Sequence, residues 1–264
     1  MAITHPVGMN PARTEIPIRK IELHDLWWAL AQGWKDFMIL RGDLVFIGFA
    51  YPVVALSAAL LAMQSSVLPL IFPLAAGSIL FGPAVASGYY ELARRRELGL
   101  DVRWRHFLDV LHGPAAPSLM ALTAVVAILF ALWIGAAQLL YAATLGPGVP
   151  VSVEALLQTV FTSSQGATMF IAGNLIGLGF AIITLAISVV SFPMLVDRRV
   201  GWWVAMHTSV RVAWKNPVTV AVWGLIVVGL LVIGSLPALV GLAVVLPVLG
   251  YATWHLYTRA VSPF

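Results

Sequence analysis

Charged residues and cysteine are what this sequence has least of. Only 10% of its 264 residues are Asp, Glu, Lys or Arg, and none is cysteine. A soluble domain carries about 25% charged residues, so this low charge excludes a surface that faces water on every side. The absence of cysteine excludes a disulfide framework, a thiolate metal site and a cysteine nucleophile.

Catalytic and cofactor motifs are also missing. The sequence contains no G-x-x-x-x-G-K-[ST], no H-E-x-x-H and no G-x-S-x-G. No two of its six histidines stand four residues apart, and none lies in the middle of an apolar run. A haem–copper oxidase catalytic subunit, which needs several intramembrane histidine ligands, is therefore excluded. We expect a protein that is not an enzyme and that has no metal site and no cofactor.

Apolar residues are abundant instead. They make up 61% of the chain, and the mean hydropathy is +0.95, so lipid is the expected solvent. The first 40 residues lack the short apolar core and small-residue cleavage site of a signal peptide. We therefore expect the membrane segments themselves to direct insertion.

Six stretches are apolar over about 20 residues, the length that a membrane-crossing helix needs. They are residues 44–63, 68–90, 119–145, 169–196, 218–236 and 237–257. The last two meet at residues 235–237, and we interpret them as a tight hairpin because one long helix would leave apolar surface in water. The predicted fold is an all-α polytopic membrane protein, in which six transmembrane helices form three hairpins. Residues 1–20 are predicted to be a flexible N-terminus, and residues 21–261 a single transmembrane domain.

The basic residues give this topology an orientation. With six spans, all 15 Lys and Arg residues fall on one side of the membrane, and the long segment 146–168 on the other side has none. The positive-inside rule then places both termini in the cytoplasm. The pI of about 9.7 accordingly indicates contact with anionic lipid head groups rather than with nucleic acid.

Residues 199–216 predict a helix that lies in the membrane interface. At 100° per residue its apolar face carries Trp202, Trp203, Met206, Val210, Ala213 and Trp214, and its polar face carries Thr208, Arg211 and Lys215. Tryptophan beside cations is typical of an interfacial amphipathic helix. The pair Asn216-Pro217 ends it, because a residue before proline avoids the helical region.

Similar segments precede the other odd-numbered spans, and we interpret two or all three of these segments as cytoplasmic interfacial helices. The first has Leu23, Leu26, Trp27, Leu30, Trp34 and Phe37 at helical spacing, next to Trp28, and the second has Trp104, Phe107, Leu108 and Leu111. Each even-numbered span carries a proline: Pro83, Pro193 or Pro247. The pattern indicates a threefold hairpin repeat, or else the aromatic belt that cytoplasmic loops commonly share.

The segment 146–168 contains one more periodic stretch. Its apolar residues Val153, Leu156, Leu157, Val160 and Phe161 fall on one helical face. They fit a short helix at the outer surface, a re-entrant segment or an ordinary ordered loop.

Three phrases resemble a known family. They are FPLAAGSILFGPAVASGYYELARRRELG (72–99), SFPMLVDRRV (191–200) and LPVLGYATWHLYTRAV (246–261). The chain is identified from them, over about residues 21–261, as a member of the bacterial integral membrane family called domain of unknown function 2189. The resemblance implies an α-helical protein of a proteobacterial inner membrane and no established activity.

Two groups of polar or small residues are candidates for a site. The arginines Arg94, Arg95, Arg96, Arg198, Arg199 and Arg211 either form interfacial salt bridges, with Glu91 and Asp197 among the acids, or line a basic vestibule that binds lipid or anions. The G-x-x-x-G of Gly173, Asn174 and Gly177 allows close helix packing, with an interhelical hydrogen bond from Asn174. That packing lies within the monomer or in a dimer, or else these residues hold a lining position. The tryptophans Trp27, Trp28, Trp34, Trp104, Trp202, Trp203 and Trp214 are the predicted interfacial anchors.

The functional hypotheses follow from the absence of catalytic and cofactor motifs. The first is a non-enzymatic accessory or assembly subunit of a larger inner-membrane complex, partnered by other membrane subunits or by copies of itself. The alternative is a channel or carrier for a small or lipidic anionic solute, with a cavity that reaches both Asn174 and the arginines. An enzyme would need convergent polar groups around a pocket, and no such set stands out in the sequence.

Overall fold

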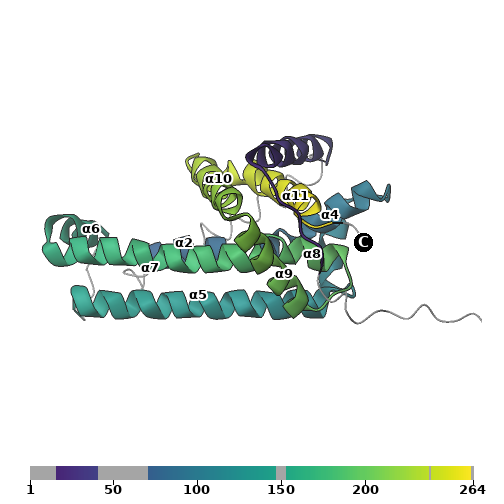
Figure 1. Ribbon diagram of the computed structural model, residues 1–264. Helices are drawn as coiled ribbons and strands as arrows, with labels where there is room; N and C mark the ends of the chain where they lie inside the picture. The colour runs from purple at the N-terminus through teal and green to yellow at the C-terminus, as the bar shows by residue number, and fades with distance from the viewer. Residues whose placement is uncertain (1–15, 41–70, 147–152, 238, 263–264) are drawn as a thin grey trace, which may run out of the picture.

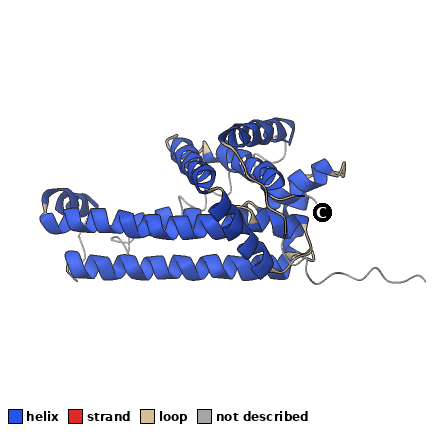
Figure 2. Ribbon diagram, in the orientation of Figure 1, coloured by secondary structure: helices blue, strands red, loops and turns tan. Residues whose placement is uncertain are grey.

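The computed structural model describes residues 16–40, 71–146, 153–237 and 239–262. Every regular element in these ranges is a helix, as Figure 2 shows, which confirms the predicted all-α class. The described residues form one isolated bridge of extended backbone, between Ile18 and Val261 near the two ends of the chain.

The helices follow one another through short connections. Residues 23–40 form a first helix, called the N-terminal helix below. The others are α2 (Ile71–Ser78), η2 (Ile79–Phe81), α3 (Gly82–Val85), α4 (Ser87–Glu97), η3 (Trp104–Leu111), α5 (Ala116–Thr144), α6 (Val153–Thr162), α7 (Ser164–Ser188), α8 (Ser191–Asp197), α9 (Trp202–Lys215), α10 (Pro217–Ser235) and α11 (Leu242–Ala260).

Within the described ranges, three helical stretches are long and apolar enough to cross a membrane. They are Ala116–Thr144, Ser164–Asp197 and Pro217–Ser235. These correspond to the third, fourth and fifth predicted spans. The first predicted span, residues 44–63, lies outside the described residues, so the prediction of six spans in three hairpins is not confirmed.

The second predicted span, residues 68–90, differs from the expectation. From Ile71 onward it is not one helix, because α2, η2 and α3 succeed one another before α4 begins at Ser87. Pro83 lies in the first turn of α3. Proline has no N–H to donate and its ring displaces the carbonyl one turn earlier, so a helix ends or bends there.

The sixth predicted span, residues 237–257, is shifted along the chain. α11 begins at Leu242 and continues to Ala260, with Pro247 inside it, so the hairpin connection is longer than the predicted three residues at 235–237. The second half of α11 carries His255 and Arg259. These polar residues explain why α11 is not among the three span-length apolar helices of the described chain.

The long helices α5 and α7 run side by side and give the molecule its elongated shape (Figure 1). α6 packs on α7 at one end of this pair. The opposite end carries α8 and α4, with α11 and the purple N-terminal helix above them in the view of Figure 1. The α5–α7 pair therefore separates two regions, an apolar end at α6 and an end where most of the shorter helices meet.

The core lies where α4, α8 and α11 meet. Its largest fully buried side chains include Tyr90, Phe192, Met194, Leu195, Tyr251, Trp254, Leu256 and Tyr257. Gly250 lets α11 approach α4, since a Cβ there would lie 2.7 Å from the Cβ of Tyr89. Gly33 lets the N-terminal helix approach α11 in the same way, because a Cβ there would lie 2.7 Å from the backbone oxygen of Val248.

A serine from α9 is inserted at the break between α7 and α8. The backbone N–H of Val190 donates to Ser209 Oγ at 3.3 Å, and Ser209 Oγ donates to the carbonyl of Ala186 at 2.8 Å. A direct bond from Val190 to Ala186 would continue α7 by one residue. A side chain inserted into the ladder interrupts a helix, and Pro193 follows in the first turn of α8 without an N–H to donate.

The predicted interfacial helices differ in how they pack. The N-terminal helix buries Leu26 and Phe37 but leaves Trp27 and Trp34 exposed. Part of its predicted apolar face is therefore in the core, and part is on the surface. η3 is a 3-10 helix rather than an α-helix. α9 buries a face of small residues, and Thr208, which the periodicity assigns to the polar face, is 2% exposed.

Candidate functional site

The first site candidate is a buried charge network, which begins on α4. Glu91 is 6% exposed and accepts hydrogen bonds from both arginines of the next turn. Arg94 Nε and Nη2 each donate to it at 2.8 Å, and Arg95 Nε donates at 2.9 Å. The bond to Glu91 raises the pKa of the Arg94 guanidinium, although desolvation opposes the shift. Arg95 also bridges to Asp109 of η3 at 2.8 Å.

Asp36 extends this network to the N-terminal helix. Its side chain is 8% exposed, pairs with Arg96 of α4, and lies 2.8 Å from Nε2 of His255 on α11. The ring of His255 meets Trp28 edge-on, with centroids 5.7 Å apart. Asp36 therefore ties three separate helices together with charge-assisted bonds in a site that is largely shielded from water.

A third group of polar contacts joins α8 to the end of α11. The hydroxyl of Tyr257 donates to Asp197 Oδ2 at 2.5 Å and accepts from Arg198 Nε at 2.9 Å. Arg198 Nη2 also donates to the backbone oxygen of Ser262 at 2.7 Å. This arginine is thus held against the C-terminal segment.

The end of α9 holds the segment that precedes the N-terminal helix. Arg211 donates to the carbonyl of Ile16 at 3.2 Å, and Lys215 donates to the carbonyl of Ile18 at 2.9 Å. Asn216 Oδ1 accepts from the N–H of Ile21 at 2.8 Å. The two ends of the described chain therefore lie together beside α9 and α11.

Internal partners thus engage five of the six predicted arginines. Arg94, Arg95, Arg96 and Arg198 bind carboxylates, and Arg211 binds a backbone carbonyl. Arg199 is exposed. The arrangement is that of the salt-bridge alternative, and binding of lipid or anions by these arginines stays a prediction.

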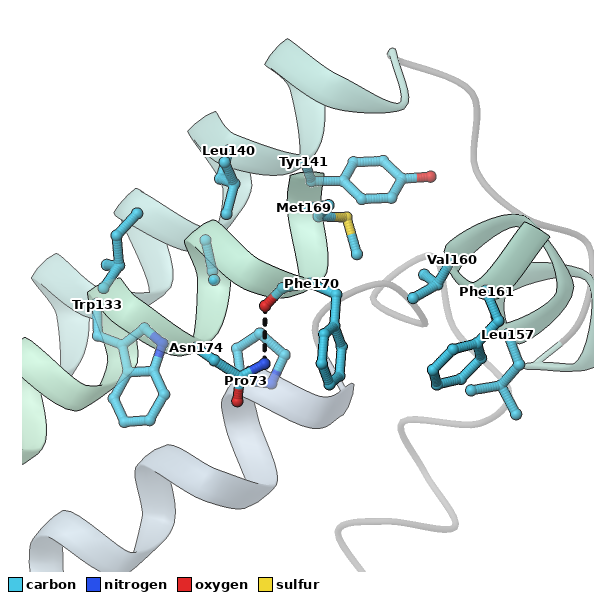
Figure 3. Close-up of a pocket in the computed structure, with 13 residues that line it drawn as sticks. Pro73, Trp133, Leu140, Tyr141, Leu157, Val160, Phe161, Met169, Phe170 and Asn174 are labelled. Carbon is cyan, nitrogen blue, oxygen red and sulfur yellow. Dashed lines mark hydrogen bonds between the residues drawn. The ribbon is translucent and has the colours of Figure 1, made fainter. Parts of the chain in front are cut away.

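The second site candidate is a cavity at the opposite end of the α5–α7 pair, called the α5–α7 pocket below. Its volume is about 280 Å³. The residues that line it come from α2, α5, α6 and α7: Pro73, Trp133, Ala137, Leu140, Tyr141, Leu157, Val160, Phe161, Met169, Phe170, Gly173, Asn174 and Ile176 (Figure 3). None of these lining residues is charged.

The turn between α6 and α7 fixes one wall of the pocket. Ser163 caps α7 by accepting a hydrogen bond from the N–H of Gly166 at 2.9 Å. Gly166 permits a close approach of the two helices, since a Cβ there would lie 2.3 Å from the carbonyl oxygen of Thr159. The periodic stretch at 153–161 therefore forms a short helix, and Phe161 on it lies 5.9 Å from the ring of Phe170 on α7.

The predicted packing residues of α7 lie along this same region. A Cβ on Gly173 would be 3.5 Å from Leu140, and one on Gly177 would be 3.4 Å from Trp133, so both glycines face α5. The amide of Asn174 donates to the carbonyl of Phe170 at 2.7 Å, within its own helix (Figure 3). The expected interhelical bond from Asn174 is absent from the described residues.

The predicted tryptophan anchors divide into two groups. Trp27, Trp34, Trp104, Trp203 and Trp214 have exposed side chains, between 49% and 81% of their surface. Trp28 instead lies under the guanidinium of Arg259, 4.1 Å from its ring centroid. Trp202 is half-buried and meets Trp203 edge-on at 5.8 Å.

A comparison with protein families bears on what kind of protein this is. Residues 71–197 match the family described as predicted integral membrane proteins (DUF2189). The family resemblance of the sequence is thereby confirmed. The match covers α2 to α8, which is shorter than the expected 21–261. No curated protein and no solved structure matches the chain.

Several polar residues that build the charge network carry no sequence motif. Asp36 and Tyr257 stand alone within amphipathic or apolar segments, and His255 has no second histidine one turn away on its helix. One signal was available, because Asp36 recurs at helical spacing from Asp25 on the face that also carries Leu26 and Phe37. The described residues contain no group of three metal-ligating side chains.

Proposed function

We propose that this integral membrane protein is non-enzymatic and binds a lipidic molecule, through an uncharged part of that molecule, in the α5–α7 pocket. The observation that carries the proposal is the lining of the pocket. Its walls are aliphatic and aromatic, and Trp133, Tyr141 and Asn174 supply its polar side-chain groups. Cavities that bind small molecules are of this kind, mostly apolar with a few polar groups that fix orientation.

The volume and the charge distribution narrow the ligand class. A cavity of about 280 Å³ lies at the lower end of the range for ligand sites, roughly 300–1,000 Å³. A cavity of this size suits one acyl chain or one end of a lipid rather than a whole phospholipid. No arginine lines the pocket, and α6 lies at the other end of the α5–α7 pair from α4 and α8 (Figure 1). We therefore propose lipid binding rather than conduction of an anion past the arginines.

The charge bias of the sequence gives this site a side of the membrane. The residues around α6 carry no Lys or Arg, whereas the opposite end of the α5–α7 pair carries most of them. By the positive-inside rule we propose an inner-membrane location with the pocket in the outer half of the bilayer and both termini in the cytoplasm.

An accessory or assembly subunit is the second candidate. It is favoured by the outward face of α10, where Val218, Leu225 and Ile233 are 67%, 72% and 62% exposed. A helix of a partner subunit could cover this face, and so could lipid. The mass of the extracted protein distinguishes a bound partner subunit from bound lipid.

The test is native mass spectrometry after gentle extraction from the native membrane. Wild type is compared with Gly173→Leu, which extends a side chain from the pocket wall, and with Gly179→Leu. Gly179 is the matched control, because it is on the same helix and a Cβ there meets nothing within 4 Å. We expect wild type and Gly179→Leu to carry a lipid mass that Gly173→Leu lacks.

Two outcomes would contradict the first proposal. Equal lipid mass on all three proteins would mean that the ligand does not occupy the α5–α7 pocket. Added polypeptide mass without a lipid would instead favour the accessory subunit.

A further inference from the structure

Three exposed tryptophans are each followed directly in the chain by an exposed cation. They are Trp34–Lys35 on the N-terminal helix, Trp104–Arg105 on η3 and Trp214–Lys215 on α9, called the Trp–cation pairs below. The tryptophans are 49%, 53% and 81% exposed, respectively. Each pair therefore presents an apolar ring and a positive charge on the surface together.

The cations of these pairs differ from the arginines of the charge network. Arg94 and Arg96, for example, are bound by Glu91 and Asp36. Among the described residues, by contrast, Lys35 and Arg105 have no carboxylate partner, and Lys215 donates to a neutral carbonyl, that of Ile18. No carboxylate among the described residues balances the charge of these three cations.

The three pairs also lie at one end of the molecule. η3 packs on α4, α9 packs on α8, and the N-terminal helix contacts α11 through Asp36 and His255. All three elements belong to the end opposite α6 (Figure 1). This end also carries the arginines of the charge network.

We propose that the Trp–cation pairs bind the anionic head groups of membrane lipids. Tryptophan partitions to the boundary between acyl chains and head groups, because its ring is apolar and its N–H is polar. A lysine or arginine next to it then lies at the depth of the lipid phosphate and is attracted to it. This inference is separate from lipid binding in the α5–α7 pocket, and it moves the anion-binding role from Arg94, Arg95 and Arg96 to Lys35, Arg105 and Lys215.

The test uses the purified full-length protein in detergent. It is titrated with phosphatidylglycerol, which is anionic, and with phosphatidylcholine of the same acyl chains, and the bound lipids are counted by native mass spectrometry. The triple variant K35Q/R105Q/K215Q removes the three charges. The matched control K35R/R105K/K215R exchanges the same side chains and keeps the charge.

We expect the triple glutamine variant to lose phosphatidylglycerol affinity by about fivefold for each charge removed, and to bind phosphatidylcholine as wild type does. The charge-keeping control should bind both lipids like wild type. The difference should shrink at high salt, because exposed charges are screened within about 10 Å at 0.1 M.

Two results would overturn the proposal. One is a triple glutamine variant with wild-type affinity for phosphatidylglycerol. The other is an equal loss from Lys20→Gln and Lys35→Gln, since Lys20 is an exposed cation without a neighbouring tryptophan, and charge alone would then explain binding. The single Lys35→Gln variant keeps the test decisive if the triple variant unfolds, because no described residue forms a hydrogen bond or an ion pair with the Lys35 ammonium.

Discussion

Asn216 holds Ile21 although 195 residues separate them in the chain. Its Oδ1 accepts the N–H of Ile21 at 2.8 Å, while its Nδ2 donates to the carbonyl of Arg19 at 3.2 Å and to that of Val212 at 3.0 Å. Asn216 is 4% exposed, and the neighbouring Thr219 hydroxyl donates to the carbonyl of Ile21 at 3.0 Å. One side chain therefore binds the last turn of α9 and fixes the entry to the N-terminal helix.

We expect Asn216→Ala to destabilise the protein by about 1–3 kcal/mol, because it leaves the buried N–H of Ile21 without its acceptor. Thermal unfolding in detergent measures the loss. The segment 16–22 should also become more open to protease. Asn174→Ala is the control, since this exposed amide bonds within its own helix, and it should change stability little. Equal effects of the two variants would contradict the role of Asn216.

The pair of buried Asp36 and partly exposed Arg96 predicts a non-additive mutant cycle. Removing Arg96 leaves the Asp36 carboxylate buried without that partner, which costs about 3–5 kcal/mol in a fully buried pair and less here, because the Arg96 side chain is 34% exposed. We therefore expect each single variant, Asp36→Leu or Arg96→Leu, to lower the melting temperature by more than half of the decrease that the double variant shows. His255 should soften the effect of Arg96→Leu, because it still contacts Asp36 at 2.8 Å.

The cycle also has a result that would refute it. Additive losses in the double variant would mean that Asp36 and Arg96 do not depend on each other. Lys20→Leu provides the comparison for removing a charge from an exposed position.

Length and hydropathy were enough to predict α5, α7 and α10, because a long apolar helix in lipid is decided by composition alone. The broken second span and the α7–α8 break were not predictable in the same way. The prolines Pro83 and Pro193 marked both places, but the second break also depends on Ser209 arriving from another helix. The sequence contains no local signal for that approach.

The site shows the same division between local and tertiary information. The i, i+3 and i, i+4 spacing of Glu91 with Arg94 and Arg95 indicated their salt bridges directly. The contact of Asp36 with His255 spans 219 residues and requires the N-terminal helix to pack on α11. The α5–α7 pocket could not be predicted either, because it arises from the way α2, α5, α6 and α7 meet.

Alanine should destabilise the protein at Gly250 but not at Gly229, although both glycines lie within helices. Substitution of Gly250 by alanine would place a Cβ 2.7 Å from the Cβ of Tyr89. Such overpacking of a core typically costs about 1–3 kcal/mol. At Gly229 of α10 a Cβ meets nothing within 4 Å, so alanine there should be neutral or slightly stabilising through its better helix propensity. Melting temperatures of G250A and G229A measure the difference, and equal values would show that α4 and α11 are not in close contact.

The absence of cysteine makes the proposed topology directly measurable. Single cysteines introduced at exposed Glu154 of α6 and exposed Arg105 of η3 would be the chain's sole thiols. If the positive-inside orientation holds, a membrane-impermeant maleimide added to intact cells under outer-membrane permeabilisation should label Glu154→Cys and spare Arg105→Cys. Inside-out vesicles should give the reverse pattern. Labelling of both positions from the same side would contradict the orientation, because α5 would then not separate η3 from α6 across the bilayer.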